Sequence, residues 1–518
     1  KGAVQEPNAF LERHILKSTY ALFDFLEENN LINRVGFKDL GAGGVACASI
    51  ELADAAGLGA EVWVDKIHTS MPELDGHIIL CSETQERFMW ACPKDLTPTI
   101  LDHYNKVFDF PNVSVGAMAS VVGKIINEKH YTVFYKDKKL VDGPIEKINE
   151  GFVYNRPMSE KKTQIENDPL PEKIDYNDLM LKILSHENVA SRAPVYESYD
   201  KNVQGRVVNE RGKTNAGVIA PFDSKKFPKE IKGDCFSAAL AHNPSIGKID
   251  PYIVAQHAVI EACAKTVSVG ASPLALTDCL CFGNPEKPEQ MWQFSQSCVA
   301  IREACSLLHF NGTDNLPIVA GNVSFYNQSG DQSIPASPMI GCFGKVSKEQ
   351  VLMNGFRSSD ANIYLVGETP AFIGGSIVVD VLNIKNTKVK KIDVQKYSNM
   401  LSCVLKANSE GLVSSGSYVG LGGLATCLFK MGFVNNVGCS IDKDIDKNLL
   451  FSENFAFVVE VSEESSAAFE EILNKSKCTY KQIGKTNKSS KIVVKNFIDL
   501  DVAQTKRTWE NALREKLQ

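Results

Sequence analysis

Residues 37–57 read FKDLGAGGVACASIELADAAG, with an acidic residue, Asp39, just before a glycine cluster and a helix of small residues. Gly41, Gly43 and Gly44 allow the backbone to approach another group closely. The helix that follows directs its free N–H groups and the positive end of its dipole at the loop. The stretch therefore predicts either a loop that holds a metal and an anion, with Asp39 as an oxygen ligand, or a tight strand-to-helix turn.

The stretch has a second copy further along the chain. SYVGLGGLATCLFKMG, residues 417–432, repeats its glycines, and FSENFAFVVEVS, residues 451–462, parallels CSETQERFMWAC, residues 81–92. QIGKT, residues 482–486, likewise parallels VVGKI, residues 121–125. Three matches in the same order and at similar spacing predict a duplicated domain.

The two copies differ in their charged residues. Asp39 is matched by Tyr418, and Gln85–Arg87 is matched by the apolar run Phe455–Phe457 with one residue gapped. Side chains that served only the fold would be needed in both copies. The difference predicts that the first copy is the functional one and that Asp39 has a role in it.

Composition excludes several classes of protein. The net charge of −6 gives no electrostatic reason to bind nucleic acid or an anionic membrane. The 14 cysteines form no CxxC pair, which indicates reduced thiols in a cytoplasmic protein. No apolar run approaches the roughly 18 residues that span a bilayer. The chain starts at Lys1 without a signal peptide, so we expect a processed or trimmed end.

At about 150 residues per domain, the length of 518 residues predicts about three domains. We expect a first domain over residues 1–155, a polar linker over 156–178, a second domain over 179–355 and a third over 356–518 that is the degenerate copy of the first.

Local patterns predict the elements of the first domain. Residues 10–29 carry a broad apolar face and predict a helix. HIILCSETQERFMWAC, residues 77–92, predicts two strands around a polar centre. ASVVGKI, residues 119–125, and YTVFYKD, residues 131–137, predict a closing hairpin.

Polar residues within apolar runs mark further candidate positions. SETQER, residues 82–87, predicts either a substrate-holding edge or a solvated strand end, because buried polar groups need partners. Asp278 lies inside the apolar run of LTDCLCFGNPEKPE and predicts a ligand contact or a loop cap. IVAGNVSFYN, residues 318–327, predicts a ligand site at a strand end or a hairpin. His186 and His242 are better explained as structural histidines.

Five motifs together resemble one family: KDLGAGG, SETQER, TDCLCFGNPEKPEQMWQF, AGNVSFYN and SPMIGCFG. They are similar to those of phosphoribosylformylglycinamidine synthase in its stand-alone synthetase form, and the opening GAVQEPNAFLERHILK is similar to that family's first segment. The resemblance implies a mixed α/β and α+β fold of tandem A–B units like those of aminoimidazole ribonucleotide synthetase. The A domains would pair into a β-barrel flanked by B domains. The chain resembles the B1–A2–B2 portion, without A1.

The family's reaction is the ATP-dependent amidation of formylglycinamide ribonucleotide to formylglycinamidine ribonucleotide in purine biosynthesis. The resemblance implies that ATP phosphorylates the amide oxygen to give an iminophosphate-type intermediate, that ammonia displaces phosphate, and that Mg²⁺ offsets charge. It implies as partners a glutaminase subunit, a small bridging subunit and an A1 domain in cis or in trans. It implies no nucleic-acid or membrane partner.

The resemblance also implies residue roles. The family's catalytic histidine lies in A1, so no catalytic residue is assigned here, and AHNPS at 241–245 is its degenerate counterpart. Cys281 and Thr84 replace an asparagine and a serine of the family's motifs. The implied contacts are to substrate for Gln5, Glu83, Thr84, Gln85 and Ser324, to ATP for Asp278 and Gly321, and to Mg²⁺ for Asp39 and Asn322.

Two other functions remain open at this point. The chain could be a non-catalytic scaffold that binds nucleotide or docks a glutaminase. It could also be another synthetase of the same fold, such as aminoimidazole ribonucleotide or selenophosphate synthetase, although the duplicated B domain disfavours both. The leading interpretation predicts one pocket around Asp39, Gln85 and Asp278.

Overall fold

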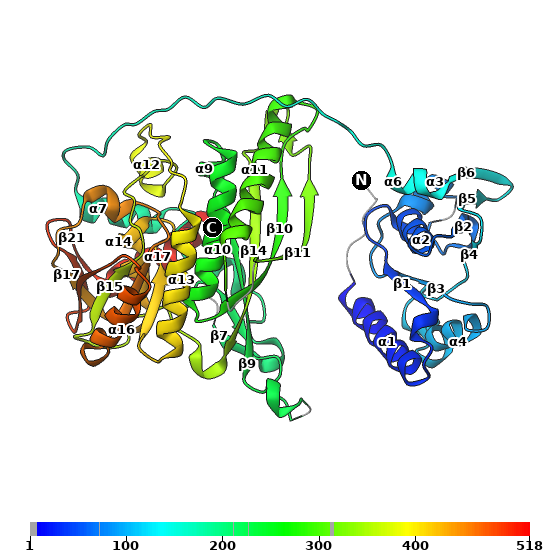
Figure 1. The fold of residues 1–518 in the computed structure, drawn as a ribbon, viewed down its shortest axis with the longest axis horizontal. Helices are drawn as coiled ribbons and strands as arrows, with labels where there is room; N and C mark the ends of the chain where they lie inside the picture. Colours follow the sequence, from blue (N-terminus) through cyan, green and yellow to red (C-terminus); the bar gives the residue numbers. More distant parts are fainter. Residues whose placement is uncertain (1–7, 72, 211, 226, 311–314) are drawn as a thin grey trace. The chain divides into compact units, whose positions relative to one another are not determined.

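A computed structural model describes the chain apart from residues 1–7, 72, 211, 226 and 311–314. Its contacts divide the chain into two compact units, unit 1 (Lys1–Asn155) and unit 2 (Arg156–Gln518), which Figure 1 shows. Each unit is described by itself below.

Unit 1 contains two small sheets. One pairs β1 with β3 antiparallel, and the other has the strand order β4-β2-β5-β6, in which β2 and β5 are parallel and the other pairs antiparallel. The strands are β1 (Gly36–Asp39), β2 (Gly59–Trp63), β3 (Phe88–Ala91), β4 (Gly123–Ile126), β5 (His130–Tyr135) and β6 (Lys138–Pro144). The helices are α1 (Ala9–Glu28), α2 (Gly44–Ala55), α3 (Gly76–Cys81), α4 (Thr97–Asp102), α5 (Phe110–Val113) and α6 (Ile145–Glu150).

Two predictions for unit 1 are wrong. The first half of residues 77–92 is the helix α3, because the side chain of Asp75 caps it by accepting a hydrogen bond from the His77 N–H, at 2.9 Å. The strands β4 and β5 form no hairpin with each other. Both pair with β2, which lies between them.

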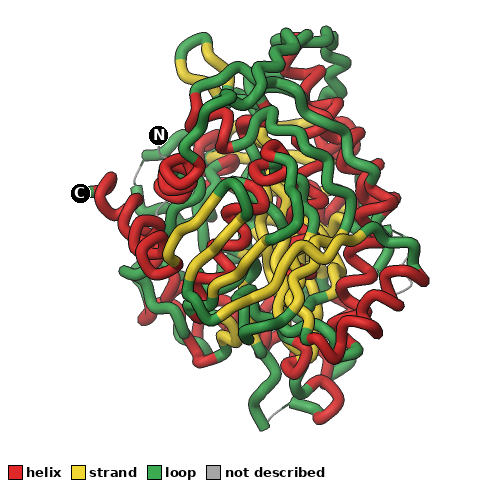
Figure 2. The backbone as a smooth tube through the Cα atoms, turned by 90° about the vertical axis from the view of Figure 1, so that its left-hand side faces the viewer, coloured by secondary structure: helices red, strands yellow, loops and turns green. Residues whose placement is uncertain are grey.

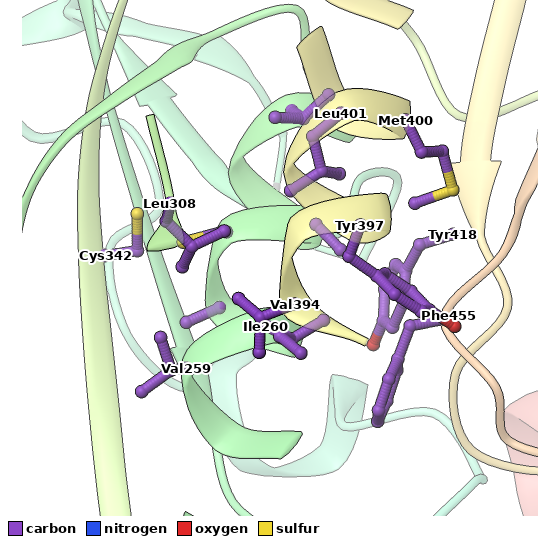
Figure 3. Packing of buried hydrophobic residues seen from close by; sticks show 14 of the residues in the cluster. Val259, Ile260, Leu308, Cys342, Val394, Tyr397, Met400, Leu401, Tyr418 and Phe455 are labelled. Carbon is purple, nitrogen blue, oxygen red and sulfur yellow. The ribbon is translucent and has the colours of Figure 1, made fainter. Parts of the chain in front are cut away.

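Unit 2 begins with a six-stranded sheet of order β11-β10-β14-β9-β8-β7. The helices α10 and α11 pack against one face of it, and apolar residues from both layers form a single buried cluster. Figure 3 shows part of this cluster, including Ile260, Tyr397 and Phe455. The strands are β7 (Val207–Asn209), β8 (Gly217–Ile219), β9 (Asp234–Ala241), β10 (Ser272–Cys281), β11 (Ile318–Ser324) and β14 (Ser337–Ser347), beside the short pair β12 (Gln328–Ser329) and β13 (Gln332–Ser333).

A seven-stranded sheet follows, of order β16-β18-β15-β19-β17-β20-β21 (strands yellow in Figure 2). Its strands are β15 (Asn362–Val366), β16 (Ser415–Tyr418), β17 (Gly438–Ile441), β18 (Phe457–Val461), β19 (Tyr480–Asn487), β20 (Lys491–Val494) and β21 (Ile498–Asp501). The helices of unit 2 are α7 (Tyr176–Ser185), α8 (Ala193–Tyr196), α9 (Pro244–Gly247), α10 (Pro251–Ser268), α11 (Pro288–Leu307), α12 (Ile377–Leu382), α13 (Val394–Ser409), α14 (Gly423–Asn435), α15 (Lys447–Phe451), α16 (Glu463–Lys475) and α17 (Val502–Leu517).

The predicted duplication is confirmed strand by strand. Asp39 pairs with Phe88 across β1 and β3, as Tyr418 pairs with Phe457 across β16 and β18. The order β4-β2-β5-β6 matches β19-β17-β20-β21 with the same parallel and antiparallel pairs. In unit 2 the strand β15 lies between β18 and β19 and joins the two parts into one sheet.

The structure shifts the alignment of the two copies by one residue at the polar cluster. The backbone N–H of Leu40 donates to the Arg87 carbonyl at 3.1 Å, and that of Val419 donates to the Ala456 carbonyl at 2.7 Å. Arg87 therefore corresponds to Ala456, and not to Phe457 as the sequence comparison placed it.

Candidate functional site

The glycine turn before α2 is a tight turn in both copies. Gly43 and Gly44 have φ values of +76° and +56°, and Gly422 and Gly423 have +80° and +74°. A Cβ on Gly44 would lie 2.4 Å from the carbonyl oxygen of Ser82. The glycines thus allow a left-handed backbone and a close approach of two segments. Binding of an anion at this turn stays a prediction.

Glu83 holds this turn in place. Its carboxylate accepts a hydrogen bond from the backbone N–H of Gly43 at 3.2 Å. In the second copy, Glu453 accepts one from Gly422 at 2.9 Å. Because the contact occurs in both copies, it belongs to the fold, and a substrate contact of Glu83 stays a prediction.

Arg87 fixes the loop of residues 82–87 from within. Its guanidinium donates to the carbonyl oxygens of Ser82 at 2.6 Å and Thr84 at 3.0 Å, and burial lowers the pKa of Arg87. Sequence reasoning placed Arg87 in a binding edge and missed this role. The exposed Gln85 donates its side-chain amide N–H to the Glu83 carbonyl at 3.1 Å, so it lies on the surface of this loop.

Unit 1 brings most of its predicted site residues together. Asp39 ends β1 and is exposed, and the hydrogen bond from Leu40 to Arg87 joins its strand end to the loop with Glu83, Thr84 and Gln85. This edge therefore carries an exposed carboxylate, that of Asp39, and an exposed amide, that of Gln85. Gln5 lies outside the described residues.

Asp278 and its neighbours form the predicted site of unit 2. Asp278 on β10 pairs with Gly321 on β11, and the backbone N–H of Asn322 donates to its carboxylate. Burial raises the pKa of Asp278. A cavity of about 390 Å³ adjoins this carboxylate and is also lined by Arg302 and Asn315. Sequence reasoning missed Arg302, because one charged residue in a helical pattern gives no signal of a binding site.

Asn322 and Ser324 lie on β11, which is the edge strand of the six-stranded sheet. Asn322 is exposed, and the hydroxyl of Ser324 accepts a hydrogen bond from the Asn327 side chain at 3.1 Å. Their order along one strand presents an amide and a hydroxyl at the same edge. A role in binding magnesium or substrate stays a prediction for each.

Binding of magnesium by Asp39 and Asn322 stays a prediction. Among the described residues, no group of three or more histidine, cysteine, aspartate or glutamate side chains is placed to bind a metal ion. Asp39 belongs to unit 1 and Asn322 to unit 2. Both offer the hard oxygen atoms that Mg²⁺ prefers, so the donor chemistry fits. The predicted pocket around Asp39, Gln85 and Asp278 likewise draws on both units and stays a prediction.

In the second copy, the edge that matches the Asp39 edge of unit 1 is buried. Tyr418, which replaces Asp39, is buried and donates its hydroxyl to Glu261 at 2.9 Å. Phe455 packs its ring on His257, with centroids 5.2 Å apart, and Figure 3 shows Tyr418 and Phe455 among the buried side chains. Burial raises the pKa of Glu453 to about 7. Asp39 is thus exposed to solvent in unit 1, whereas Tyr418 and Phe455 at the matching edge of unit 2 are buried.

The two histidines differ in their surroundings. His186 forms a hydrogen bond through Nε2 with Asp380 at 2.9 Å. His242 is partly buried, which lowers its pKa, and its Nδ1 has no hydrogen-bond partner. All fourteen cysteines are free thiols, as the sequence predicts. Within the described part of the chain, no helix is both long and apolar enough to cross a bilayer.

Comparison with known protein families matches three segments of the chain. Residues 214–346 match the model of the AIR synthase related protein, N-terminal domain, and residues 1–136 and 360–495 match the C-terminal domain of that family. The PurL subunit of phosphoribosylformylglycinamidine synthase from Methanothrix thermoacetophila is 33% identical over 531 residues, covering 100% of this chain and 68% of the relative.

Two solved structures of Thermotoga maritima PurL share the fold. The one complexed with ATP has a TM-score of 0.61 at 21% identity and covers 94% of this chain and 68% of that one. The one complexed with FGAR has a TM-score of 0.62 at 20% identity and covers 93% and 65%. Identity along its whole length and the matched domains show that the chain belongs to the PurL family of phosphoribosylformylglycinamidine synthase, a family of ligases.

Proposed function

We propose that the protein takes part in the ATP-dependent conversion of formylglycinamide ribonucleotide to formylglycinamidine ribonucleotide in purine biosynthesis. Its membership of the PurL family supports this, as do the complexes of a relative with ATP and with FGAR. The observation that carries the assignment to this chain is the contrast between the copies. Unit 1 keeps Asp39 and Gln85 exposed, whereas Tyr418 and Phe455 close the matching edge of unit 2.

The chemistry needs one phosphoryl transfer and one displacement. ATP transfers its γ-phosphoryl group to the amide oxygen of the substrate and leaves as ADP. Ammonia then adds to the same carbon, and the C–O bond breaks to release phosphate. Mg²⁺, held by Asp39 and Asn322, would offset charge on the phosphoryl group, for which positioning and electrostatics supply most of the catalysis.

Within this scheme ATP and the ribonucleotide substrate have different contact residues. Asp278 and Gly321, with Arg302 lining the adjoining cavity, would contact ATP, since a guanidinium pairs well with phosphate. Gln5, Glu83, Thr84, Gln85 and Ser324 would contact the ribonucleotide substrate. Ammonia would come from a glutaminase subunit through a small bridging subunit, and the location would be cytoplasmic.

A second domain of the N-terminal AIR synthase type would pack on the six-stranded sheet. The chain matches that domain once but the C-terminal type twice. The outer face of the sheet exposes large apolar side chains, including Phe236, Leu240, Leu274 and Met339. An exposed apolar patch of this kind marks an interaction surface. Such a partner would carry the catalytic histidine that the family places in its first domain.

Titration calorimetry and a turnover assay test the proposal. MgATP and formylglycinamide ribonucleotide are each titrated into the full chain, and ADP and product are then measured with ammonium chloride as the nitrogen source. The assay is repeated with the N-terminal domain of the Methanothrix thermoacetophila relative added. Binding of both ligands with turnover in either assay supports the proposal. Binding of both without turnover favours a nucleotide-binding scaffold, and failure to bind the ribonucleotide contradicts the proposed substrate.

A further inference from the structure

Asn327 lies just beyond the end of β11, where it joins the ends of two strands. β10 and β11 run parallel (Figure 1), and Cys281 pairs with Ser324 at their last residues. The backbone N–H of Phe282 donates to the Ser324 carbonyl at 2.9 Å, and the Asn327 N–H donates to the Phe282 carbonyl at 3.1 Å. The carboxyl ends of both strands and Asn327 therefore form one hydrogen-bonded unit.

The surrounding carbonyl groups fix the orientation of the Asn327 amide. Its Nδ2 lies 3.1 Å from the carbonyl oxygen of Phe282 and 2.7 Å from that of Ser324. Carbonyl oxygens only accept hydrogen bonds, so the amide N–H groups must face them. The same Nδ2 lies 3.1 Å from Oγ of Ser324, and its two N–H groups are shared among the three oxygens. Asn327 therefore donates to the Ser324 hydroxyl.

This contact leaves the hydrogen of the Ser324 hydroxyl for a ligand. A hydroxyl group donates one hydrogen bond and can accept two. Within the described part of the chain, the acceptor for this hydroxyl is Oδ1 of Asn327 at 3.5 Å, which is at the outer limit of a hydrogen bond. Ser324 is half-buried, so one side of it stays open. A substrate contact of Ser324 would therefore be a donation to an oxygen atom.

The turn that contains Asn327 is held from two directions. The rings of Phe282 and Phe325 both pack on Phe294 of α11, with centroids 5.4 and 5.1 Å from that ring. The Asn327 carbonyl accepts a hydrogen bond from the backbone N–H of Ile334 at 3.1 Å. The amide of Asn327 thus has a fixed position, which a residue that orients another side chain requires.

We propose that Asn327 is a positioning residue, which orients Ser324 so that its hydroxyl donates a hydrogen bond to an oxygen atom of the ribonucleotide. In this arrangement Asn327 acts on the ligand only through Ser324. The role of Asn327 rests on the proposed function, because formylglycinamide ribonucleotide is taken as the ligand of Ser324.

The variant Asn327→Ala should keep the local fold. In this variant the Ser324 carbonyl still accepts from the Phe282 N–H, and the Phe282 carbonyl still accepts from the N–H of residue 327. Neither carbonyl therefore loses its last donor, which is the costly case. We expect the urea midpoint to stay close to that of the parent, while the Ser324 hydroxyl becomes free to rotate.

The test is a double-mutant cycle on the full chain, with the ribonucleotide and MgATP each titrated by calorimetry. We expect the dissociation constant for the ribonucleotide to rise about tenfold in Ser324→Ala and about fivefold in Asn327→Ala. The double variant should bind no more weakly than Ser324→Ala, because Asn327 acts through the hydroxyl that is already absent. The affinity for MgATP should stay unchanged. Gln328→Ala, at the exposed next residue, is the matched control.

The outcomes separate the positioning role from the proposed function. Additive losses in the double variant, or an equal loss of MgATP affinity, would show a merely structural role and overturn the proposal. If Ser324→Ala weakens binding and Asn327→Ala does not, the substrate contact stands and the positioning role is wrong. If Ser324→Ala binds the ribonucleotide as well as the parent does, the contact and the positioning role are both wrong, although the substrate stands.

Crystal structures of the parent and of Asn327→Ala test the orientation without any ligand. We expect one rotamer of Ser324 in the parent and a different or mixed rotamer in the variant. The same single rotamer in both would overturn the positioning role even if the ribonucleotide binds. Failure of the parent to bind the ribonucleotide would instead contradict the proposed function and, with it, the ligand assigned to Ser324.

Discussion

Asp278 and Gly321 lie opposite each other on the parallel strands β10 and β11, and a Cβ on Gly321 would lie 2.2 Å from a carboxylate oxygen of Asp278. The glycine therefore leaves the space that the carboxylate occupies. The backbone N–H of Asn322 then donates to the same carboxylate. The position of the acid thus depends on the absence of a side chain on the neighbouring strand.

Gly321→Ala should weaken nucleotide binding, because the methyl group displaces the Asp278 carboxylate. We expect the dissociation constant for MgATP to rise about tenfold, which corresponds to the loss of one good polar contact. Calorimetric titration of the full chain measures it. Gly217→Ala is the matched control, since the nearest atom to its Cβ lies at 3.9 Å. Equal affinity in both variants would remove Asp278 from the nucleotide site.

Asp39→Asn should raise the magnesium concentration required for nucleotide or substrate binding, since a neutral amide is a weaker ligand than a carboxylate. We expect the Mg²⁺ midpoint to rise about tenfold. The measurement is a magnesium titration at fixed ATP and substrate. Asp137→Asn, on the exposed turn between β5 and β6, is the control. An unchanged midpoint would show that Asp39 binds no metal.

Glu83 can be tested for its two roles separately. Glu83→Ala removes the acceptor for the Gly43 N–H and should lower the free energy of unfolding of unit 1 by about 1 kcal/mol. Glu83→Gln keeps an oxygen acceptor and should cost less. If the carboxylate also contacts substrate, the Gln variant loses substrate affinity at nearly unchanged stability. Urea unfolding and substrate titration distinguish these results, with Glu150→Ala at the exposed end of α6 as control.

Stability of unit 2 should fall as the pH rises from about 4.5 to about 7. Burial raises the pKa of Glu453 from 4.5 to about 7, although the hydrogen bonds from the backbone N–H groups of Ile377 and Gly422 oppose this shift. Between these values the folded state keeps a proton that the unfolded state has lost, so rising pH favours unfolding. The shift corresponds to a change on the order of 3 kcal/mol.

Glu453→Gln should flatten this part of the pH profile, because an amide does not titrate and still offers an oxygen to Gly422. Urea midpoints at pH 5 and pH 7.5 measure the change for the parent and the variant. Glu464→Gln, exposed on α16, is the control and should keep the parent profile. A profile of the Gln variant that falls as steeply as that of the parent would exclude Glu453 as its cause.

Patterns local in sequence predicted much of the fold. The helix over residues 10–29 matches α1, because its apolar face repeats with the helical period. The duplication was visible because Gly43, Gly44 and their copies are the residues that tolerate positive φ. Asp39 and Gln85 have no polar counterpart in the second copy, and this difference identified the edge of unit 1 that contains them as the candidate site.

Other features needed the tertiary structure. The run before Ser82 has the apolar content of a strand, and only the cap from Asp75 and packing of Ile79 and Leu80 show it as α3. The role of Arg87 depends on how the loop of residues 82–87 folds back on its guanidinium, and the role of Arg302 depends on the cavity that it lines. Neither follows from the spacing of residues in the sequence.

By itself the sequence determined the family, the duplicated architecture and the copy that keeps its polar residues, since these depend on residue identity and order. The tertiary structure decided which strands are neighbours: β2 lies between β4 and β5, and β15 lies between β18 and β19. Strand pairing joins residues far apart in the chain through backbone groups that every residue carries. Residue identity alone therefore leaves the pairing partner open.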